Sequence, residues 1–286
     1  MQWTPGEDNP DIEDRRDESG GGGGGGPIRP VHLGLGGVLI VGALSLIFHQ
    51  NFFALLSGPP GGSISQPSAH SLPNAALDEQ EKPKVQFVGF VLGDVQRVWE
   101  QKLGQYRHAK LVLFRDSYPS ACGQAETATG PFYCPGDEKV YLDLGFFDEL
   151  RDRFGAPGEF AEAYVIAHEI GHHVQKILGI ESKVRQLQMR SPSEQNPLSV
   201  KLELQADCFA GAWANSTEQR KIIDQSDVES GLQAAAAVGD DRLQRAATGR
   251  VNPESFTHGS SAQRVSWFQR GMKAGDISAC NTFNAQ

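Results

Sequence analysis

Residues 158–179, GEFAEAYVIAHEIGHHVQKILG, carry an apolar stripe that recurs every three or four positions. This spacing predicts an amphipathic helix of about five or six turns with one buried face. Pro157 and Gly158 stand before the helix, and Gly179 is suited to end it. The stripe consists of Phe160, Ala163, Ala167, Ile170, Val174 and Ile177.

The same helix carries the motif HEIGHH at residues 168–173. The spacing of four places His168 and His172 on one face, so that both imidazoles can reach one zinc ion at about 2.0–2.1 Å. Glu169 is rotated by about 100° and can reach a water on that metal. The motif therefore predicts two zinc ligands and a general base. The competing interpretation is a histidine-rich solvated face, and His173 is expected to lie outside the ligand set.

A catalytic zinc ion has three protein ligands and an open position. A metzincin would have histidine at position 178, where this chain has Leu178. Residues 196–216 predict a second amphipathic helix, with Asn196 as its N-cap. On this helix Glu203 is the candidate third ligand, and Asp207 would accept the free N–H of a ligand histidine. The alternative is an acidic pair on a solvated face.

The chain divides into four predicted regions. Residues 1–30 are acidic and glycine-rich, which is typical of a disordered tail. Residues 31–48 contain no charged side chain, and with the residues up to 56 they predict one transmembrane anchor. Residues 57–84 resemble a flexible linker, and residues 85–286 form the soluble domain. A cleaved signal peptide is the alternative to an anchor, but the long acidic start disfavours it.

The charge distribution predicts an orientation and excludes one class of partner. Arg29 precedes the predicted anchor, and no Lys or Arg follows it until Lys82. The positive-inside rule then places the N-terminus in the cytoplasm and the domain outside the cell inner membrane. A net charge of −9 without a basic run excludes nucleic-acid binding.

In the soluble domain one helical pattern is followed by strand patterns and then by a long, mostly helical segment. Helical spacing over residues 87–103 is followed by strand-like segments at 110–114 and 139–144, and the chain from Glu159 onward is mostly helical. This order predicts an α+β fold. The strand at 139–144 is either an edge strand that binds an extended peptide or an internal core strand.

Four motifs in order resemble the bacterial neutral zinc metallopeptidases, a membrane-anchored, single-pass family. They are CGQAETATGPFYCP, HEIGHH, ELQADCFAG and FTHGSSAQRVSWFQRG, and the resemblance covers nearly the whole chain. It implies a zincin-like domain, mostly helical with a small antiparallel sheet, that binds Zn²⁺. It also implies His168, His172 and Glu203 as zinc ligands and Glu169 as the base.

The E-x-x-A-D pattern is also similar to that of the CAAX-processing proteases, which are gluzincins. In those enzymes a histidine followed six residues later by arginine lies near the zinc, and His258 and Arg264 match that spacing. His258 is therefore expected to bond the oxyanion, and Arg264 to orient groups of the site. This chain departs from the pattern at Gly259, where those enzymes have proline. The alternative is a helix start capped by Thr257, Ser260 or Ser261.

The four cysteines form no CxxC pair. Their even number fits disulfides in an oxidising compartment, and the alternative is four buried thiols in a cytosolic protein. Of the three possible connectivities we favour Cys122–Cys134. That choice leaves Cys208–Cys280 to tie the C-terminal tail to the Glu203 helix, unless Cys208 is free and buried.

Together these patterns predict a membrane-anchored zinc endopeptidase of gluzincin type that acts on peptide or protein substrates. Glu169 would deprotonate a zinc-bound water, and His258 would help to polarise the peptide carbonyl. One alternative is an envelope scaffold or regulatory protein with a structural or vestigial zinc, which a fourth ligand such as His173 would favour. Another is a zinc amidohydrolase that acts on a non-peptide amide, which a cleft without a free strand edge would favour.

Overall fold

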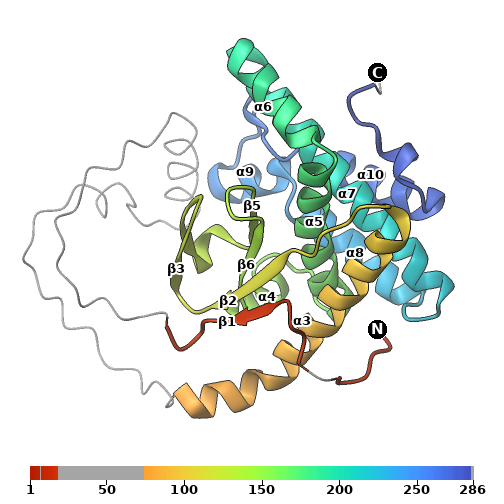
Figure 1. Ribbon diagram of the computed structural model, residues 1–286. Coiled ribbons are helices and arrows are strands. Elements are labelled where there is room, and N and C mark those ends of the chain that lie inside the picture. The colour runs from red at the N-terminus through yellow and green to blue at the C-terminus, as the bar shows by residue number, and fades with distance from the viewer. Residues whose placement is uncertain (7, 19–73, 285–286) are drawn as a thin grey trace, which may run out of the picture.

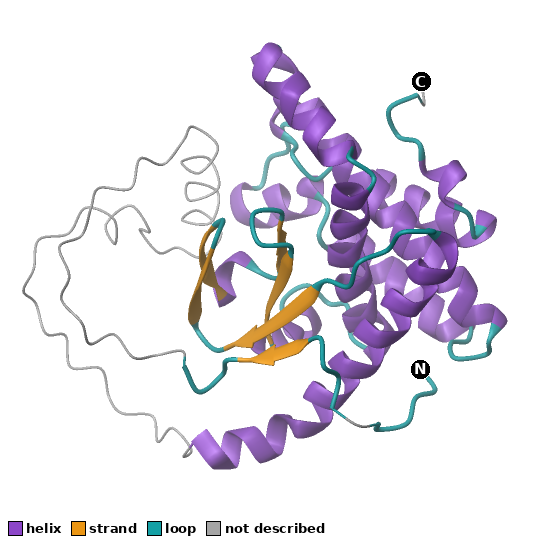
Figure 2. Ribbon diagram, in the orientation of Figure 1, coloured by secondary structure: helices purple, strands orange, loops and turns teal. Residues whose placement is uncertain are grey.

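The computed structural model describes residues 1–6, 8–18 and 74–284, and this part of the chain is mostly helical with two small sheets (Figures 1 and 2). The helices are α3 (Asn74–Lys102), α4 (Gly145–Asp152), α5 (Glu159–Ile177), α6 (Ile180–Arg190), α7 (Gln195–Gln219), α8 (Gln225–Ala237), α9 (Asp240–Thr248) and α10 (Ser261–Ala274). The strands are β1 (Ile12–Asp14), β2 (Lys110–Phe114), β3 (Ser117–Ser120), β4 (Gly123–Glu126), β5 (Phe132–Cys134) and β6 (Lys139–Asp143). The α+β class expected from the sequence agrees with this set of helices and strands.

Helix α5, which carries the HEIGHH motif, lies in the middle of the molecule between the sheet and the helices α7, α8 and α10 (Figure 1). Its apolar stripe is buried as the spacing predicts, with Phe160, Ile170 and Val174 fully enclosed. Helix α3 packs against α5 and α7 and contributes Trp99 to the same core. The motif helix is therefore held on several sides.

The larger sheet has the order β1-β2-β6-β5. β1, β2 and β6 are parallel, and only β5 is antiparallel to its neighbour. The expectation of an antiparallel sheet is therefore wrong for most strand pairs of this sheet. The reason is the connection between β2 and β6. It holds the β3–β4 hairpin and β5, which gives it the length that a parallel crossover needs. The strand predicted at 139–144 is internal, and β5 is the outer strand beside it.

The N-terminal residues are part of the folded body, so the prediction of disorder for residues 1–30 is wrong for the part that is described. β1 pairs with β2 in parallel, and Asp11 is buried. The Asp11 carboxylate accepts hydrogen bonds from Gln96 Nε2 at 2.9 Å and from Lys110 Nζ at 2.8 Å. The composition of residues 1–30 indicated disorder. It could not show that the partners of Asp11 lie about a hundred residues later in the chain.

The predicted linker at residues 57–84 is likewise wrong from residue 74 onward, where α3 begins. Glu81 in this part accepts hydrogen bonds from Arg16 at 2.6 Å and from Arg115 at 2.7 Å. α7 begins at Gln195, one residue before the predicted cap Asn196, because a 3₁₀ turn over Pro192–Glu194 runs directly into it.

No helix in residues 1–6, 8–18 and 74–284 is long and apolar enough to cross a membrane. The anchor predicted at residues 31–56 lies outside the residues that the structure describes.

Helices α7 and α10 cross at very close range through two glycines. A methyl group on Gly211 of α7 would overlap the carbonyl oxygen of Phe268, and one on Gly271 of α10 would overlap the carbonyl oxygen of Cys208. The backbones of the two helices therefore touch, and no side chain larger than hydrogen fits at either position.

Gly211→Ala is expected to lower the free energy of unfolding by about 3 kcal/mol, at the upper end of the usual cost of overpacking. Chemical denaturation of both proteins would measure the difference. Gly104→Ala is the matched control, because a methyl group at Gly104 meets no atom within 4 Å. Its effect should stay within about 0.5 kcal/mol. Equal stability of the two variants would contradict the close crossing.

Candidate metal centre

Helices α5 and α7 lie side by side and bring His168, His172 and Glu203 together. His168 Nε2 is 3.1 Å from Glu203 Oε2, and His172 Nε2 is 3.4 Å from Glu203 Oε1. Gly171, inside the motif, allows this approach, because a Cβ there would lie 3.0 Å from the carbonyl oxygen of Ala206 on α7. The motif thus contributes two donors and the space for the helix that carries the third.

These three side chains fit a zinc ion in both chemistry and spacing. One ligand atom from each lies within 4.8 Å of the others. Ligand atoms at the corners of a zinc tetrahedron are about 3.4 Å apart, which is close to the two distances given above. Two imidazoles and one carboxylate are the donor set of catalytic zinc sites that keep a fourth position open.

Asp207, predicted to support a ligand histidine, is fully buried behind His168. Its Oδ1 lies 2.9 Å from His168 Nδ1, which leaves Nε2 to face Glu203. Arg264 donates to the same carboxylate from Nε at 2.8 Å and from Nη2 at 2.9 Å, and the Tyr164 hydroxyl donates as well. Burial acts to raise the pKa of Asp207, but Arg264 and His168 outweigh it and lower the pKa to about 2.

The second histidine is oriented by a residue that sequence reasoning missed. His172 Nδ1 lies 2.9 Å from Oε1 of Gln175, one turn further along α5. The spacing of three on a helix was the available signal for this pair. Both histidines therefore have Nδ1 occupied and Nε2 directed at Glu203. Burial lowers the pKa of His172, but the Glu203 carboxylate outweighs it and raises the pKa to about 9.

Glu169 lies beside the cluster and next to strand β5. It is 8% exposed, and burial raises the pKa of its carboxyl although His168 and His172 act in the opposite direction. The backbone of Tyr133 in β5 also acts to lower the pKa of this carboxyl. The acidic group of the motif therefore faces the outer strand of the sheet.

His173 is completely buried and lies outside the cluster, as expected. Its Nε2 donates to the carbonyl oxygen of Arg107 at 2.7 Å, and its Nδ1 accepts from the Tyr133 hydroxyl at 3.0 Å. This assignment needs a neutral ring, and burial does lower the pKa of His173. The third histidine thus attaches β5 to α5.

His258 lies on the loop before α10, with its side chain about half exposed. Its Nδ1 is 3.2 Å from Asp240 Oδ1, and the backbone N–H groups of Thr257, His258 and Gly259 all donate to Asp240 Oδ2. Burial acts to lower the pKa of His258, but Asp240 and the nearby Glu203 outweigh it, and the pKa is raised. Asp240, which sequence reasoning also missed, therefore sets the course of this loop.

The glycine that departs from the CAAX pattern has a physical reason. Gly259 has φ +90°, which the proline ring does not allow. A Cβ there would also lie 3.3 Å from side chains of Leu204 and Val200 on α7. Ser260, one of the three predicted caps, starts α10 through a capping box with Gln263.

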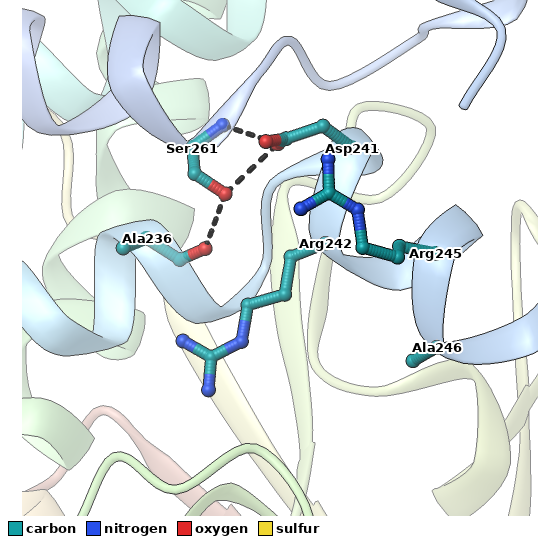
Figure 3. Close-up of a pocket in the computed structure, with 6 residues that line it drawn as sticks. All are labelled: Ala236, Asp241, Arg242, Arg245, Ala246 and Ser261. Atoms are coloured by element: carbon teal, nitrogen blue, oxygen red, sulfur yellow. Dashed lines mark hydrogen bonds between the residues drawn. The ribbon is translucent and has the colours of Figure 1, made fainter. Parts of the chain in front are cut away.

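A small pocket beside this loop shows how α9 is tied to α10 (Figure 3). Ser261 donates to the Asp241 carboxylate from its backbone N at 2.6 Å and from its hydroxyl at 2.8 Å. The hydroxyl oxygen also lies 2.7 Å from the carbonyl oxygen of Ala236, so its single proton is shared between the two acceptors. The tie keeps the adjacent Asp240 under the His258 loop. Arg242 and Arg245 line the pocket, and no residue of the metal cluster does.

Both favoured disulfides are present, Cys122–Cys134 and Cys208–Cys280, and no cysteine is free. The first links the loop after β3 to β5. The second links α7 to the 3₁₀ turn over Ile277–Cys280 near the end of the chain.

Comparison with known proteins shows the family to which the chain belongs. Residues 1–283 match the model of a family described as "Putative neutral zinc metallopeptidase". The chain is 44% identical to the Escherichia coli protein YpfJ over 290 aligned residues, which covers 99% of each chain. It is 43% identical over 202 residues to Rv2575 of Mycobacterium tuberculosis, covering 67% of this chain and 68% of the relative. No solved structure matches.

Asp207→Ala is expected to lower the free energy of unfolding of the metal-free chain by about 3–5 kcal/mol, because it removes the nearest counter-charge of the buried Arg264 guanidinium and leaves only Glu203, 3.9 Å away. Denaturation in the presence of a chelator would measure this loss. The double variant Asp207→Ala/Arg264→Leu removes both charges and should recover most of it. A single variant within about 1 kcal/mol of the wild type would contradict the buried ion pair.

Proposed function

We propose that this chain, which belongs to the neutral zinc metallopeptidase family, is a zinc-dependent endopeptidase that holds its metal on His168, His172 and Glu203. The observation that carries the proposal is the convergence of these donors within 4.8 Å, with the buried carboxyl of Glu169 beside them. Both ring nitrogens of His173 are engaged elsewhere, which disfavours the structural zinc site that a fourth ligand would make.

A bound zinc ion would polarise the scissile carbonyl and lower the pKa of water at the open position. Glu169 takes the proton from the attacking water and delivers it to the leaving amine. Burial raises the pKa of Glu169 toward the operating pH, which suits a group that must both accept and release a proton. With Nδ1 of His258 held by Asp240, its Nε2 is the atom that bonds the developing oxyanion.

The substrate class follows from strand β5. In the described part of the chain β5 pairs only with β6, so its outer side is the edge to which an extended peptide can add. Helix α5, which carries Glu169, packs against β5, so a peptide bound at this edge would lie near the base. This supports a peptide substrate over the non-peptide amide considered from the sequence.

Glu169→Gln is expected to keep about one zinc per chain and to lose hydrolysis by at least about 10²–10⁴-fold, because the amide cannot accept the proton. Metal analysis and turnover of a denatured protein such as unfolded casein would measure the two effects. Glu203→Ala is the matched variant and should lose the zinc as well as the activity. Retained turnover in Glu169→Gln would contradict the base assignment, and a zinc-free wild type would contradict the whole site.

The two disulfides support an oxidising, extracytoplasmic location for residues 74–284. Because β1 pairs with β2, residues 8–18 must share that compartment when the chain is folded in this way. A cytoplasmic N-terminus with the domain outside does not fit this pairing. We therefore propose that both parts lie on one side of the membrane. The single-pass anchor predicted at residues 31–56 would put them on opposite sides, so this pairing and that anchor are alternatives.

Single cysteines at two exposed positions, Asp17→Cys and Arg185→Cys, test this arrangement in the full chain. The side chains are 72% and 62% exposed, and the native cysteines are all in disulfides. In intact bacterial spheroplasts a membrane-impermeant maleimide should label both positions equally. Labelling of Arg185→Cys alone, with Asp17→Cys reached only after lysis, would show that β1 is not paired in the cell.

A further inference from the structure

A buried polar path runs from the ligand His172 to the C-terminal disulfide. Gln175 Oε1 lies 2.9 Å from His172 Nδ1, and Gln175 Nε2 donates to Gln205 Oε1 at 3.2 Å. Gln205 Nε2 donates to the carbonyl oxygen of Cys280 at 2.9 Å. Gln175 and Gln205 are 1% and 4% exposed, and the cystine that Cys280 forms with Cys208 is fully buried. Water therefore has little access to this path.

The path has a direction, because an amide has one donor end and one acceptor end. The Cys280 carbonyl only accepts, so Gln205 turns its NH₂ group toward it and its oxygen toward Gln175. Gln175 in turn presents its NH₂ group to Gln205 and its oxygen to His172. His172 Nδ1 must then carry the proton, which leaves Nε2 free to bind a metal.

The disulfide controls where this path ends. The Cys280 carbonyl belongs to a short 3₁₀ turn near the C-terminus, and Cys208 stands on α7 three residues after Gln205. Another tie to α7 is the Thr282 hydroxyl, which donates to the carbonyl oxygen of Lys201 at 2.7 Å. Without the disulfide the Cys280 carbonyl is no longer covalently fixed over Gln205.

The two ligand histidines differ in how their orientation is set. His168 Nδ1 faces the ionised Asp207, and a carboxylate accepts a hydrogen bond in any rotation. His172 faces the neutral side-chain amide of Gln175. If this amide group rotated by 180°, it would present its NH₂ group to the ring instead of its oxygen. Gln175 Nε2 has two acceptors, the carbonyl oxygen of Leu202 at 2.7 Å and Gln205 Oε1 at 3.2 Å, and Gln205 is the one that bonds the Cys280 carbonyl.

We propose that Gln175 and Gln205 are positioning residues that couple the Cys208–Cys280 disulfide to the metal ligand His172, so that metal binding is tight only when this disulfide is formed. The inference rests on the proposed zinc site. It implies that the chain binds zinc weakly under reducing conditions and strongly after oxidation, which links metal loading to arrival in the oxidising compartment.

The test measures zinc affinity of the full chain by competition with a chromophoric chelator. Cys208→Ala/Cys280→Ala is expected to bind zinc about 10-fold more weakly, at the lower end of the effect of losing an outer partner of a ligand histidine. Cys122→Ala/Cys134→Ala is the matched control and should bind as the wild type does, because that disulfide contacts no metal ligand. Alanine variants are preferable to thiol reductants, which bind zinc themselves.

Gln175→Leu and Gln205→Leu keep both disulfides and test the path if the cysteine variant is poorly folded. Gln175→Leu should weaken zinc binding by about 10–100-fold, and Gln205→Leu should weaken it by a smaller factor. Cobalt substitution gives a second readout, since a misoriented His172 alters the visible d–d spectrum. Unchanged zinc affinity in Gln205→Leu, or in a folded Cys208→Ala/Cys280→Ala, would overturn the coupling and leave the zinc site intact. A wild type that binds no zinc would overturn both proposals.

Discussion

The buried carboxylate of Asp207 joins the three helices on which the metal centre depends. It stands on α7 and bonds Arg264 of α10 together with Tyr164 and His168 of α5. An ionised carboxylate without partners costs several kcal/mol in a protein interior, so these helices must meet in one register. Glu203 lies one turn before Asp207 on the same helix. The contact that aligns the helices therefore also sets the third donor opposite the histidine pair.

Sequence reasoning reached this centre because its parts repeat within single helices. His168 and His172 are four residues apart on α5, and Glu203 and Asp207 are four apart on α7, so each pair could be assigned to one helix face. The two helices could be assigned to one site by the chemical argument that a zinc ion held by two histidines needs a third ligand such as a carboxylate. The small residue Gly171 was not interpreted, although it allows the helices to approach.

The remaining features depend on partners far away in the chain. The acidic N-terminus was interpreted as disordered, because Lys110 and Lys139, which pair with Asp11 and Glu13, lie about a hundred residues later. The parallel pairing of β1 with β2 left no local pattern for the same reason. Asp240 carries no signal of its own, since its four hydrogen bonds go to a loop that begins 17 residues later. Periodicity describes one element at a time and cannot supply such pairs.

The third histidine of HEIGHH connects the base to the strand that would receive a peptide. Helix α5 packs against β5, and His173, one turn after Glu169, accepts a hydrogen bond from the Tyr133 hydroxyl. This bond fixes β5 to α5 at Tyr133, and the Arg107 carbonyl fixes His173 in turn. A peptide added to β5 would take its position relative to Glu169 from these contacts. In the proposed peptidase the six residues of the motif would supply ligands, base and substrate alignment together, because all of them lie within one and a half turns of a helix that the rest of the fold encloses.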